Sequence, residues 1–351
     1  MFVEDGIEAV PAGREAFQDA DTLDAFVRQC DAIVHLAGMN RGKDAEIAQV
    51  NLGLAEALVG AMARVGRRPH IVFSSSTHID LDTAYGRSKR AAAEVFDRWA
   101  NSQGARFTNL VLPHVFGEGG QPFYNSVVST FCYQLAKGTQ PRIDNDGQLE
   151  LLHAQEVADH ALVAIRDGAT GDIRPSGRRI RVSGMLKRAY HLADRYRSGV
   201  IPRFDDLFDL RLFNTYRSYL FPDFYPKRLE LHSDDRGSLF EAVKTDNGGQ
   251  AFLSTTRPGI TRGDHFHFNK VERFLVVQGE AVIRLRRMFD HRVGEFRVSG
   301  DQPAFVDMPT LHTHNITNVG NGELLTLFWA HEIFDTERPD THREPVVQDA
   351  V

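Results

Sequence analysis

Apolar positions in roughly the first 225 residues alternate between short continuous runs and longer stretches in which they recur every three or four residues. The continuous runs at 33–36, 70–76 and 109–112 predict buried strands. The stretches 45–66 and 85–104 have the spacing of amphipathic helices and end at a glycine. Strands that alternate with helices predict a parallel sheet, so we expect an α/β Rossmann-like domain over residues 1–225.

After Tyr225 only short strand-like runs follow one another, separated by Gly, Pro, Asn and Asp. This pattern predicts an all-β barrel over residues 226–351. The segment 203–226 looks like the linker between the two domains, and its many aromatic residues predict that it packs against the folded chain. The strand-like runs are 250–259, 272–288, 291–300, 303–310 and 323–334.

Composition narrows the function classes. A chain of 351 residues exceeds what one hydrophobic core usually supports, and its formal net charge of −6 leaves no global basic excess for nucleic acid or an anionic membrane. Cys30 and Cys132 lack metal-type spacing, which predicts reduced packing residues. No apolar run is long enough to span a bilayer, and the first residues lack the pattern of a signal peptide. We therefore expect a cytoplasmic protein without nucleic-acid or membrane partners.

The β-rich part carries four candidate metal ligands. His265 and His267 are two positions apart, so on a strand they would share one face. Glu272 falls on the next predicted strand, and His314 lies at a later junction of turn and strand. Three imidazoles and one carboxylate suit Zn²⁺ or another divalent metal such as Ni²⁺, Mn²⁺ or Fe²⁺. We expect the neighbouring His312 either to support these ligands or to lie at the surface.

The same residues resemble the cupin family. Residues 259–279 fit its motif G-x5-H-x-H-x4-E-x6-G in full, and Pro309, His314 and Asn318 fit the second motif, P-x-G-x2-H-x3-N. Leu311 stands where the family usually has glycine, a departure that affects the tight turn and not the ligand. The resemblance implies a cupin barrel with a bound metal. The competing interpretation, scattered surface histidines, does not explain why all four ligands fall in register.

Tyr85 and Lys89 form a Tyr-x3-Lys pair at the start of a predicted helix, and Ser76 lies nine residues before Tyr85. A tyrosine can give a proton to a ketone oxygen as hydride arrives at the carbon, and a lysine one turn away lowers the pKa of the phenol. A serine hydroxyl would polarise the carbonyl, with Ser76 as first choice and Ser75 as fallback. The set resembles the extended short-chain dehydrogenase/reductases that act on nucleotide sugars.

This resemblance implies NADPH as cofactor. His35 is expected to be a strand residue and not a catalyst, and Arg14 is better interpreted as a solvated surface residue than as a partner of the 2′-phosphate. The positions that the resemblance assigns to the cofactor are Leu36, Ala37, Gly38, Lys89 and Arg14. Those assigned to the substrate are His114, which replaces the family's asparagine, and Asn125.

The reductase family begins with a strand and a glycine-rich turn that binds the cofactor's pyrophosphate. No such turn precedes the run 7–10, which looks like the second strand of that fold. We therefore expect an N-terminally incomplete doubly wound parallel sheet that lacks roughly one β-α unit of about 30 residues, through truncation or a misassigned start. NADPH binding is correspondingly doubtful. Two alternatives stay open: a cupin-only epimerase and a metal-stabilised binding module.

Blocks along nearly the whole chain, such as 33–41, 124–136 and 334–341, resemble the CapF family of capsular-polysaccharide enzymes. This resemblance implies a bifunctional homodimer on the route to UDP-N-acetyl-L-fucosamine. The cupin would epimerise C3 of a UDP-2-acetamido-2,6-dideoxy-hexos-4-ulose, a UDP-4-keto-6-deoxy-N-acetylhexosamine, and the reductase would then reduce its C4 ketone with NADPH. The string 234–241 resembles the opening strand of sugar-nucleotide epimerases, so Arg236 would help to hold the diphosphate.

Overall fold

The computed structural model describes residues 2–4, 6–235 and 237–348, and the chain divides into two compact units. The first comprises residues 1–115 and 150–179, and the second comprises residues 116–149 and 180–351. This division follows packing, whereas the predicted boundary between 225 and 226 follows the change in element type and stays a prediction. The second unit contains the helices α4 (Val127–Ala136), α6 (Val182–Arg197) and α7 (Leu207–Ser218) together with the barrel.

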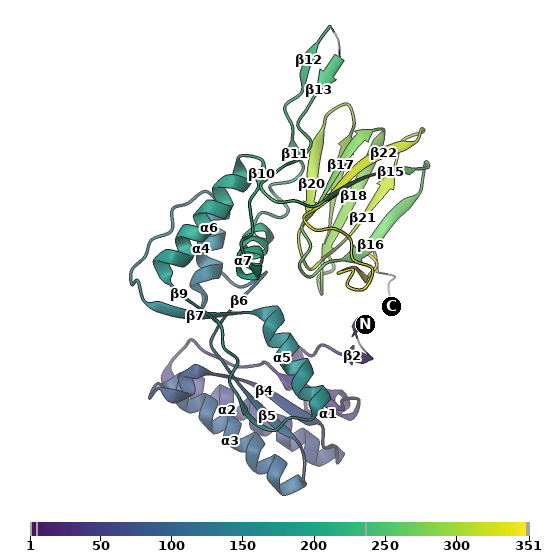
Figure 1. The fold of residues 1–351 in the computed structure, drawn as a ribbon. Helices are drawn as coiled ribbons and strands as arrows, with labels where there is room; N and C mark the ends of the chain where they lie inside the picture. The colour runs from purple at the N-terminus through teal and green to yellow at the C-terminus, as the bar shows by residue number, and fades with distance from the viewer. Residues whose placement is uncertain (1, 5, 236, 349–351) are drawn as a thin grey trace. The chain divides into compact units, whose positions relative to one another are not determined.

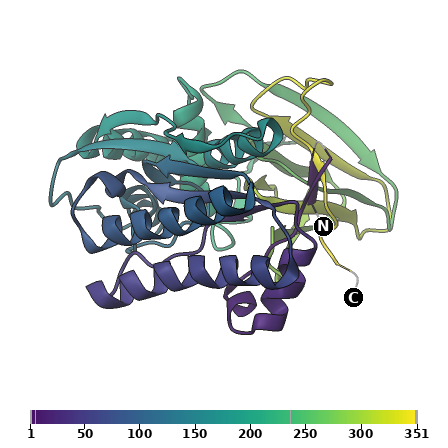
Figure 2. The same cartoon turned by 90° about the horizontal axis from the view of Figure 1, so that it is seen from below.

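The first unit is built on a parallel sheet of strand order β3-β4-β5-β8. Helices α1, α2 and α3 cover the face that carries Ile71 and Phe73, and α5 covers the face that carries Val72 and Leu110 (Figures 1 and 2). This confirms the Rossmann-like fold. The bounds are α1 (Ala20–Arg28), β3 (Ala32–His35), α2 (Asp44–Val65), β4 (His70–Ser76), α3 (Ala84–Gln103), β5 (Phe107–Leu112), α5 (Ala154–Asp167) and β8 (Gly171–Ile173).

The ends of the two long helices lie where the glycines predict them. Gly66 follows α2 with φ of +68°, and Gly104 follows α3 with φ of +60°, so both close their helix in the left-handed conformation. The other elements around this unit are the short helices η1 (Arg14–Phe17) and η2 (Thr77–Asp80) and the sheet of β6 (His114–Phe116), β7 (Gln148–His153) and β9 (Arg178–Arg181).

The N-terminal strand differs from the sequence prediction. The run predicted as the second strand of the parallel sheet forms β2 (Ile7–Ala9), which pairs antiparallel with β1 (Phe2–Glu4). Gly6, with φ of +78°, permits the tight turn between them. A three-residue run has little sequence signal for its partner, and here the partner is local. In the described residues the parallel sheet therefore has four strands, of which β3 is the first along the chain.

The second unit contains two five-stranded antiparallel sheets, of order β11-β20-β17-β22-β15 and β19-β18-β21-β16-β23 (Figure 1). They enclose one apolar cluster that includes Leu275, Ile283 and Phe305, which confirms the all-β barrel. The strand bounds are β11 (Lys227–Arg228), β15 (Gln250–Thr256), β16 (Thr261–Phe266), β17 (Glu272–Gln278), β18 (Glu280–Arg287), β19 (Val293–Ser299), β20 (Ala304–Met308), β21 (His312–Asn318), β22 (Leu324–Ala330) and β23 (His342–Arg343). Two further pairs are β10 (Val200–Ile201) with β14 (Lys244–Thr245) and β12 (His232–Asp234) with β13 (Gly237–Leu239).

The predicted linker is a packed helix. All residues from 209 to 217 of α7 are buried, and the Arg217 guanidinium donates to the carbonyl oxygen of Met308 in the barrel at 3.3 Å. The expectation that this segment packs against the folded chain is thus confirmed. Both cysteines are free thiols, as expected. Among the described residues, no helix combines the length and apolar character needed to cross a membrane.

Candidate functional site

Tyr85 lies in the first turn of α3, next to the end of β4. The Thr83 hydroxyl accepts the Gly86 N–H at 3.0 Å and so caps the helix. A Cβ on Gly86 would lie 2.2 Å from the carbonyl oxygen of His78, so only glycine lets this turn approach η2 so closely. The ring of Tyr85 consequently lies 5.7 Å from the ring of His78.

Lys89 lies one turn further along α3 and is buried. Its ammonium donates to the carbonyl oxygen of Ser74 at 2.8 Å and lies 5.9 Å from the centroid of the Tyr85 ring. Burial lowers the pKa of Lys89 to about 8. A Cβ on Gly38 would lie 3.4 Å from this ammonium, so the loop after β3 comes close to Lys89.

The two candidate serines differ in their bonding. Ser76 Oγ accepts the His78 N–H at 3.3 Å and so begins η2. Ser75 Oγ is buried and has no hydrogen-bond partner in the described part of the chain. The Ser76 hydroxyl is thus already used to cap η2, whereas the Ser75 hydroxyl is available for a further hydrogen bond. Both serines stay candidates for polarising the substrate carbonyl.

The remaining predicted residues of this site are placed as follows. His114 is exposed, and its ring lies 6.2 Å from that of His78, which links it to Tyr85 through one side chain. Arg14 is exposed in η1, and Asn125 is exposed in the turn before α4. Arg236 lies outside the described residues.

Two buried polar residues, His35 at the end of β3 and Asn51 in α2, lie near the candidate site. His35 packs against the rings of Phe17, Phe73 and Phe96, and burial lowers its pKa to about 4, so it is a core strand residue, as expected. Sequence reasoning missed Asn51, a buried residue of α2.

Asn51 ties the loop after β3 to both neighbouring helices. Its amide donates to the Met39 carbonyl and to Ser88 Oγ, each at 2.8 Å, and its side-chain oxygen accepts the Met39 N–H at 2.6 Å. An asparagine among apolar positions of a predicted helix was the available signal. The residue holds the 36–38 segment beside Lys89.

The four predicted metal ligands come together in the barrel. One ligand atom from each of His265, His267, Glu272 and His314 lies within 4.8 Å of the others. The His267 and His314 Nε2 atoms lie 3.0 and 3.3 Å from Glu272 Oε2. β16 ends at Phe266, so His267 joins the cluster from just beyond the strand and not from within it.

The backbone orients two of the imidazoles. His267 Nδ1–H donates to the carbonyl oxygen of Asp340, and His314 Nδ1–H donates to that of His312 at 3.0 Å, so both Nε2 atoms face the cluster. His312 is buried, so the surface alternative is wrong, and the residue supports His314 through its backbone carbonyl oxygen. Its burial follows from packing against Phe221, whose ring centroid lies 4.7 Å away.

The electrostatics of the cluster favour cation binding. Burial and the two neighbouring imidazoles lower the pKa of His265 to about 3, so its nitrogen lone pair is free at neutral pH. Burial raises the pKa of Glu272, but the contacts with His267 and His314 outweigh it, and the net shift is downward. The site therefore offers the free lone pair of His265 and the carboxylate of Glu272, next to the Nε2 atoms of His267 and His314.

A divalent metal fits these residues. Buried His314 Nε2 finds no partner of hydrogen-bond geometry in the described chain, which is costly for a polar atom unless something binds it. Atoms about 2.1 Å from a shared Zn²⁺ would lie roughly 3.4 Å apart in a tetrahedron. The distances of 3.0 and 3.3 Å from Glu272 Oε2 to the two Nε2 atoms are close to this spacing, and all four ligand atoms lie within 4.8 Å of one another. The donor set of nitrogen and oxygen suits Zn²⁺.

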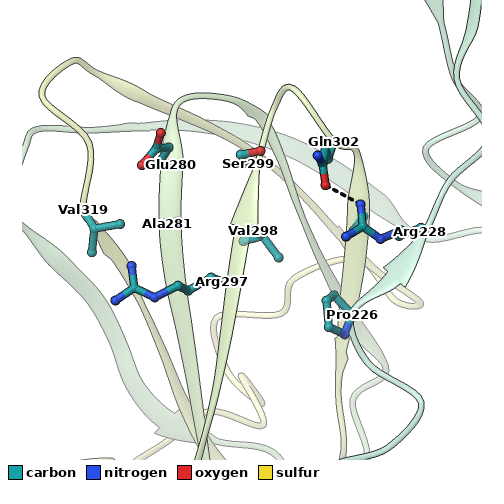
Figure 3. A pocket seen from close by; sticks show the side chains of 10 residues that line it. Pro226, Arg228, Glu280, Ala281, Arg297, Val298, Ser299, Gln302 and Val319 are labelled. Carbon is teal, nitrogen blue, oxygen red and sulfur yellow. Dashed lines mark hydrogen bonds between the residues drawn. The ribbon is translucent and has the colours of Figure 1, made fainter.

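A hollow of about 290 Å³ lies elsewhere in the barrel, beside β18, β19 and β20 (Figure 3). It lies between the starts of β18 and β20, where the Arg228 guanidinium donates a hydrogen bond to the side-chain oxygen of Gln302. Glu280 and Arg297 also line it. The register that pairs Ala281 with Asn318 and Leu285 with His314 places it away from the ligands. It contributes nothing to the metal cluster.

Comparisons with known proteins identify both parts of the chain. Residues 14–175 match the NAD dependent epimerase/dehydratase family, and residues 232–342 match the polysaccharide biosynthesis C-terminal domain. The chain is 33% identical over 344 residues to the UDP-2-acetamido-2,6-beta-L-arabino-hexul-4-ose reductase of Pseudomonas aeruginosa, covering 96% of this chain and 91% of that protein. The chain belongs to the family of this reductase.

A solved structure is similar to this chain over most of its length. The crystal structure of the capsular polysaccharide assembling protein CapF from Staphylococcus aureus is similar with a TM-score of 0.56 and 30% identity, over 93% of this chain and 90% of that one. The spore coat polysaccharide biosynthesis protein SpsL of Bacillus subtilis is 27% identical over 129 residues, 34% of this chain and 85% of that protein. The resemblance to the CapF family inferred from the sequence is confirmed, and the chain is a nucleotide-sugar enzyme of polysaccharide biosynthesis.

Proposed function

We propose that this chain catalyses two steps on one UDP-2-acetamido-2,6-dideoxy-hexos-4-ulose, epimerisation at C3 in the barrel and reduction at C4 in the Rossmann-like unit. The product would lead to UDP-N-acetyl-L-fucosamine for capsule or O-antigen. The observation that carries the reductase half is the buried Lys89 ammonium, bound to the Ser74 carbonyl beside Tyr85. The similarity to the Pseudomonas aeruginosa UDP-2-acetamido-2,6-beta-L-arabino-hexul-4-ose reductase supports the same substrate class.

In the reductase half, the Tyr85 hydroxyl donates a proton to the C4 oxygen. The nearby Lys89 cation stabilises the negative charge that develops on the phenol oxygen as this proton leaves. Ser76, or Ser75 with its spare hydroxyl, donates a hydrogen bond to the same C4 oxygen. NADPH, when bound, supplies the hydride to C4. Gly38 and Lys89 border the place that its nicotinamide end would take.

No described residue is proposed to bind the pyrophosphate of NADPH. In residues 2–4 and 6–31, ahead of β3, the described chain has no glycine-rich turn between a parallel strand and a helix. One alternative is an epimerase whose reductase unit does not bind cofactor. A fluorescence titration with NADPH separates the two, because the bifunctional enzyme gives a saturable signal and the epimerase alone gives none.

In the barrel, the C4 ketone of the substrate acidifies the proton on C3, so a base can remove it and return it to the opposite face. Four protein ligands leave little room for an open coordination position. We infer that Zn²⁺ bound by His265, His267, Glu272 and His314 organises the pocket and does not activate water. We also infer that the protein is a homodimer, which light scattering after gel filtration tests.

Two variants separate the steps. Tyr85→Phe should stop NADPH oxidation yet still exchange the C3 proton of the keto-sugar with D₂O. His314→Ala should stop exchange yet still oxidise NADPH when the epimerised keto-sugar is supplied. Tyr190→Phe, a change of the same kind in α6, serves as the control. It should both oxidise NADPH and exchange the C3 proton. If Tyr85→Phe retains wild-type NADPH oxidation, or if wild-type protein exchanges no C3 proton, the corresponding half of the proposal is wrong.

A further inference from the structure

Asp340 holds the short connection between two of the metal ligands. Its Oδ1 accepts the Phe268 N–H at 2.8 Å, and its Oδ2 accepts the N–H groups of Asn269 and Lys270 at 2.9 and 2.8 Å. Its own carbonyl oxygen accepts Nδ1–H of His267. One residue that supplies no ligand therefore fixes three of the four residues between His267 and Glu272.

The chain around Asp340 is tied to the same region at further points. We call residues 339–343 the C-terminal strap. β23 of the strap pairs with β16 at His265 and Phe266. The Lys270 ammonium donates to the carbonyl oxygen of Pro339 at 2.7 Å. The strap thus touches His265 by strand pairing, His267 by a hydrogen bond and the 268–270 connection by a carboxylate.

Asp340 has the backbone conformation that this geometry requires. Its φ of +39° lies in the left-handed region, which aspartate tolerates better than most residues with a side chain. That conformation lets both its carbonyl oxygen and its carboxylate reach the ligand-bearing segment. Bonds between a charged acceptor and backbone N–H groups are stronger than neutral ones, so the carboxylate offsets the entropy cost of ordering the connection.

We propose that the C-terminal strap, through Asp340, positions His265 and His267 for metal before the metal arrives. The proposal rests on the metal site of the proposed function. It makes metal retention depend on a segment about 70 residues further along the chain than these ligands, which contributes no ligand atom. Asp340 is a positioning residue, since it acts through His267 and the connection.

The test is the affinity of the purified full chain for Zn²⁺, measured by competition with a chromophoric chelator. Asp340→Asn keeps the shape and tolerates the backbone, but it loses the charge and one acceptor oxygen. It should weaken Zn²⁺ binding about 10- to 100-fold, the usual effect of removing a group that orients a ligand. Asp335→Asn is the matched control, because Asp335 is an exposed aspartate shortly before the strap, and the affinity of this variant for Zn²⁺ should equal that of the wild type.

Further outcomes keep the proposal decidable. Hydrogen exchange of the metal-free protein should show lost protection at 268–270 in Asp340→Asn alone. Should that variant fail to fold, Lys270→Met, which removes the ammonium's bonds to Pro339 and Thr341 of the strap, should still weaken Zn²⁺ binding, by a smaller factor. Unchanged affinity in Asp340→Asn, or in Lys270→Met where the first variant does not fold, overturns the strap and leaves the metal site standing. A wild-type chain that binds no Zn²⁺ overturns both.

Discussion

The backbone N–H of Leu311 donates a hydrogen bond to the carbonyl oxygen of His267 at 2.9 Å. This bond joins the turn of the second cupin motif to a ligand of the first. Leu311 makes it with φ of +59°, the left-handed conformation for which the family's glycine is suited. The sequence departure at this position therefore changes the strain in the turn and leaves the connection to the ligands intact.

This strain predicts an unusual order of stabilities. Leu311→Gly should be more stable than Leu311→Ala by about 1 kcal/mol. A residue with a Cβ destabilises the folded chain by roughly 1–2 kcal/mol in this conformation. Glycine avoids this cost, but its greater freedom in the unfolded chain cancels part of the gain. Both variants lose the same side-chain contacts, so the comparison isolates the backbone. Urea unfolding measures the difference, and an alanine variant at least as stable as the glycine variant would contradict the account.

Loss of a ligand should release the metal. His265→Ala and His314→Ala each leave three ligands, and the metal content should fall from about one ion per chain to a small fraction of that. The melting temperature should fall with it. The exposed His291 gives the control, since His291→Ala should keep the metal. Elemental analysis after desalting decides, and unchanged content in both ligand variants refutes the assignment.

Gly86 should be intolerant of any side chain. A Cβ there would meet the backbone oxygens of His78 and Leu81 at 2.2 and 2.6 Å, so Gly86→Ala should cost about 1–3 kcal/mol and displace Tyr85. Gly53, exposed in α2 with no atom within 4 Å of an added Cβ, should instead gain about 1 kcal/mol as Gly53→Ala. Thermal unfolding and NADPH oxidation report both effects. Equal stability changes in the two variants would count against the packing described.

Lys89 should make stability depend on alkaline pH. Burial lowers its pKa from 10.5 to about 8 in the folded chain, so between these values the unfolded chain binds a proton that the folded chain has released. Stability from this group therefore rises with pH through that window. Urea unfolding at several pH values should show the rise in wild type relative to Lys89→Met. The exposed Lys187 provides the control Lys187→Met, which should follow the wild type; a Lys89→Met profile parallel to wild type would rule the shift out.

Periodicity and motif spacing predicted much of the fold. The helical spacing at 45–66 and 85–104 gave α2 and α3 within a residue or two, because apolar faces and terminal glycines act locally. The cupin spacing predicted the metal cluster because it encodes strand period and turn length together. These are properties of neighbouring residues.

What sequence reasoning missed depends on distant partners. The pairing of β2 with β1, the burial of His312 against Phe221 and the bonds of Asn51 are all set by tertiary packing. Asp340, about 70 residues after His267, likewise gives no local signal of its contact with that ligand. The sequence around a histidine or asparagine does not show whether its hydrogen-bond partner is water or the backbone of another strand.

The central claim, that one keto-sugar undergoes chemistry at C3 and at C4 in this protein, is tested most directly by the isotopic content of the product. Wild-type protein is incubated in D₂O with the UDP-4-keto-sugar and unlabelled NADPH, and the reduced sugar is examined by mass spectrometry and NMR. The account predicts one deuterium at C3, taken from solvent, and hydrogen at C4, taken from the cofactor. A reduced sugar without deuterium at C3, or no reduced sugar at all, would contradict it.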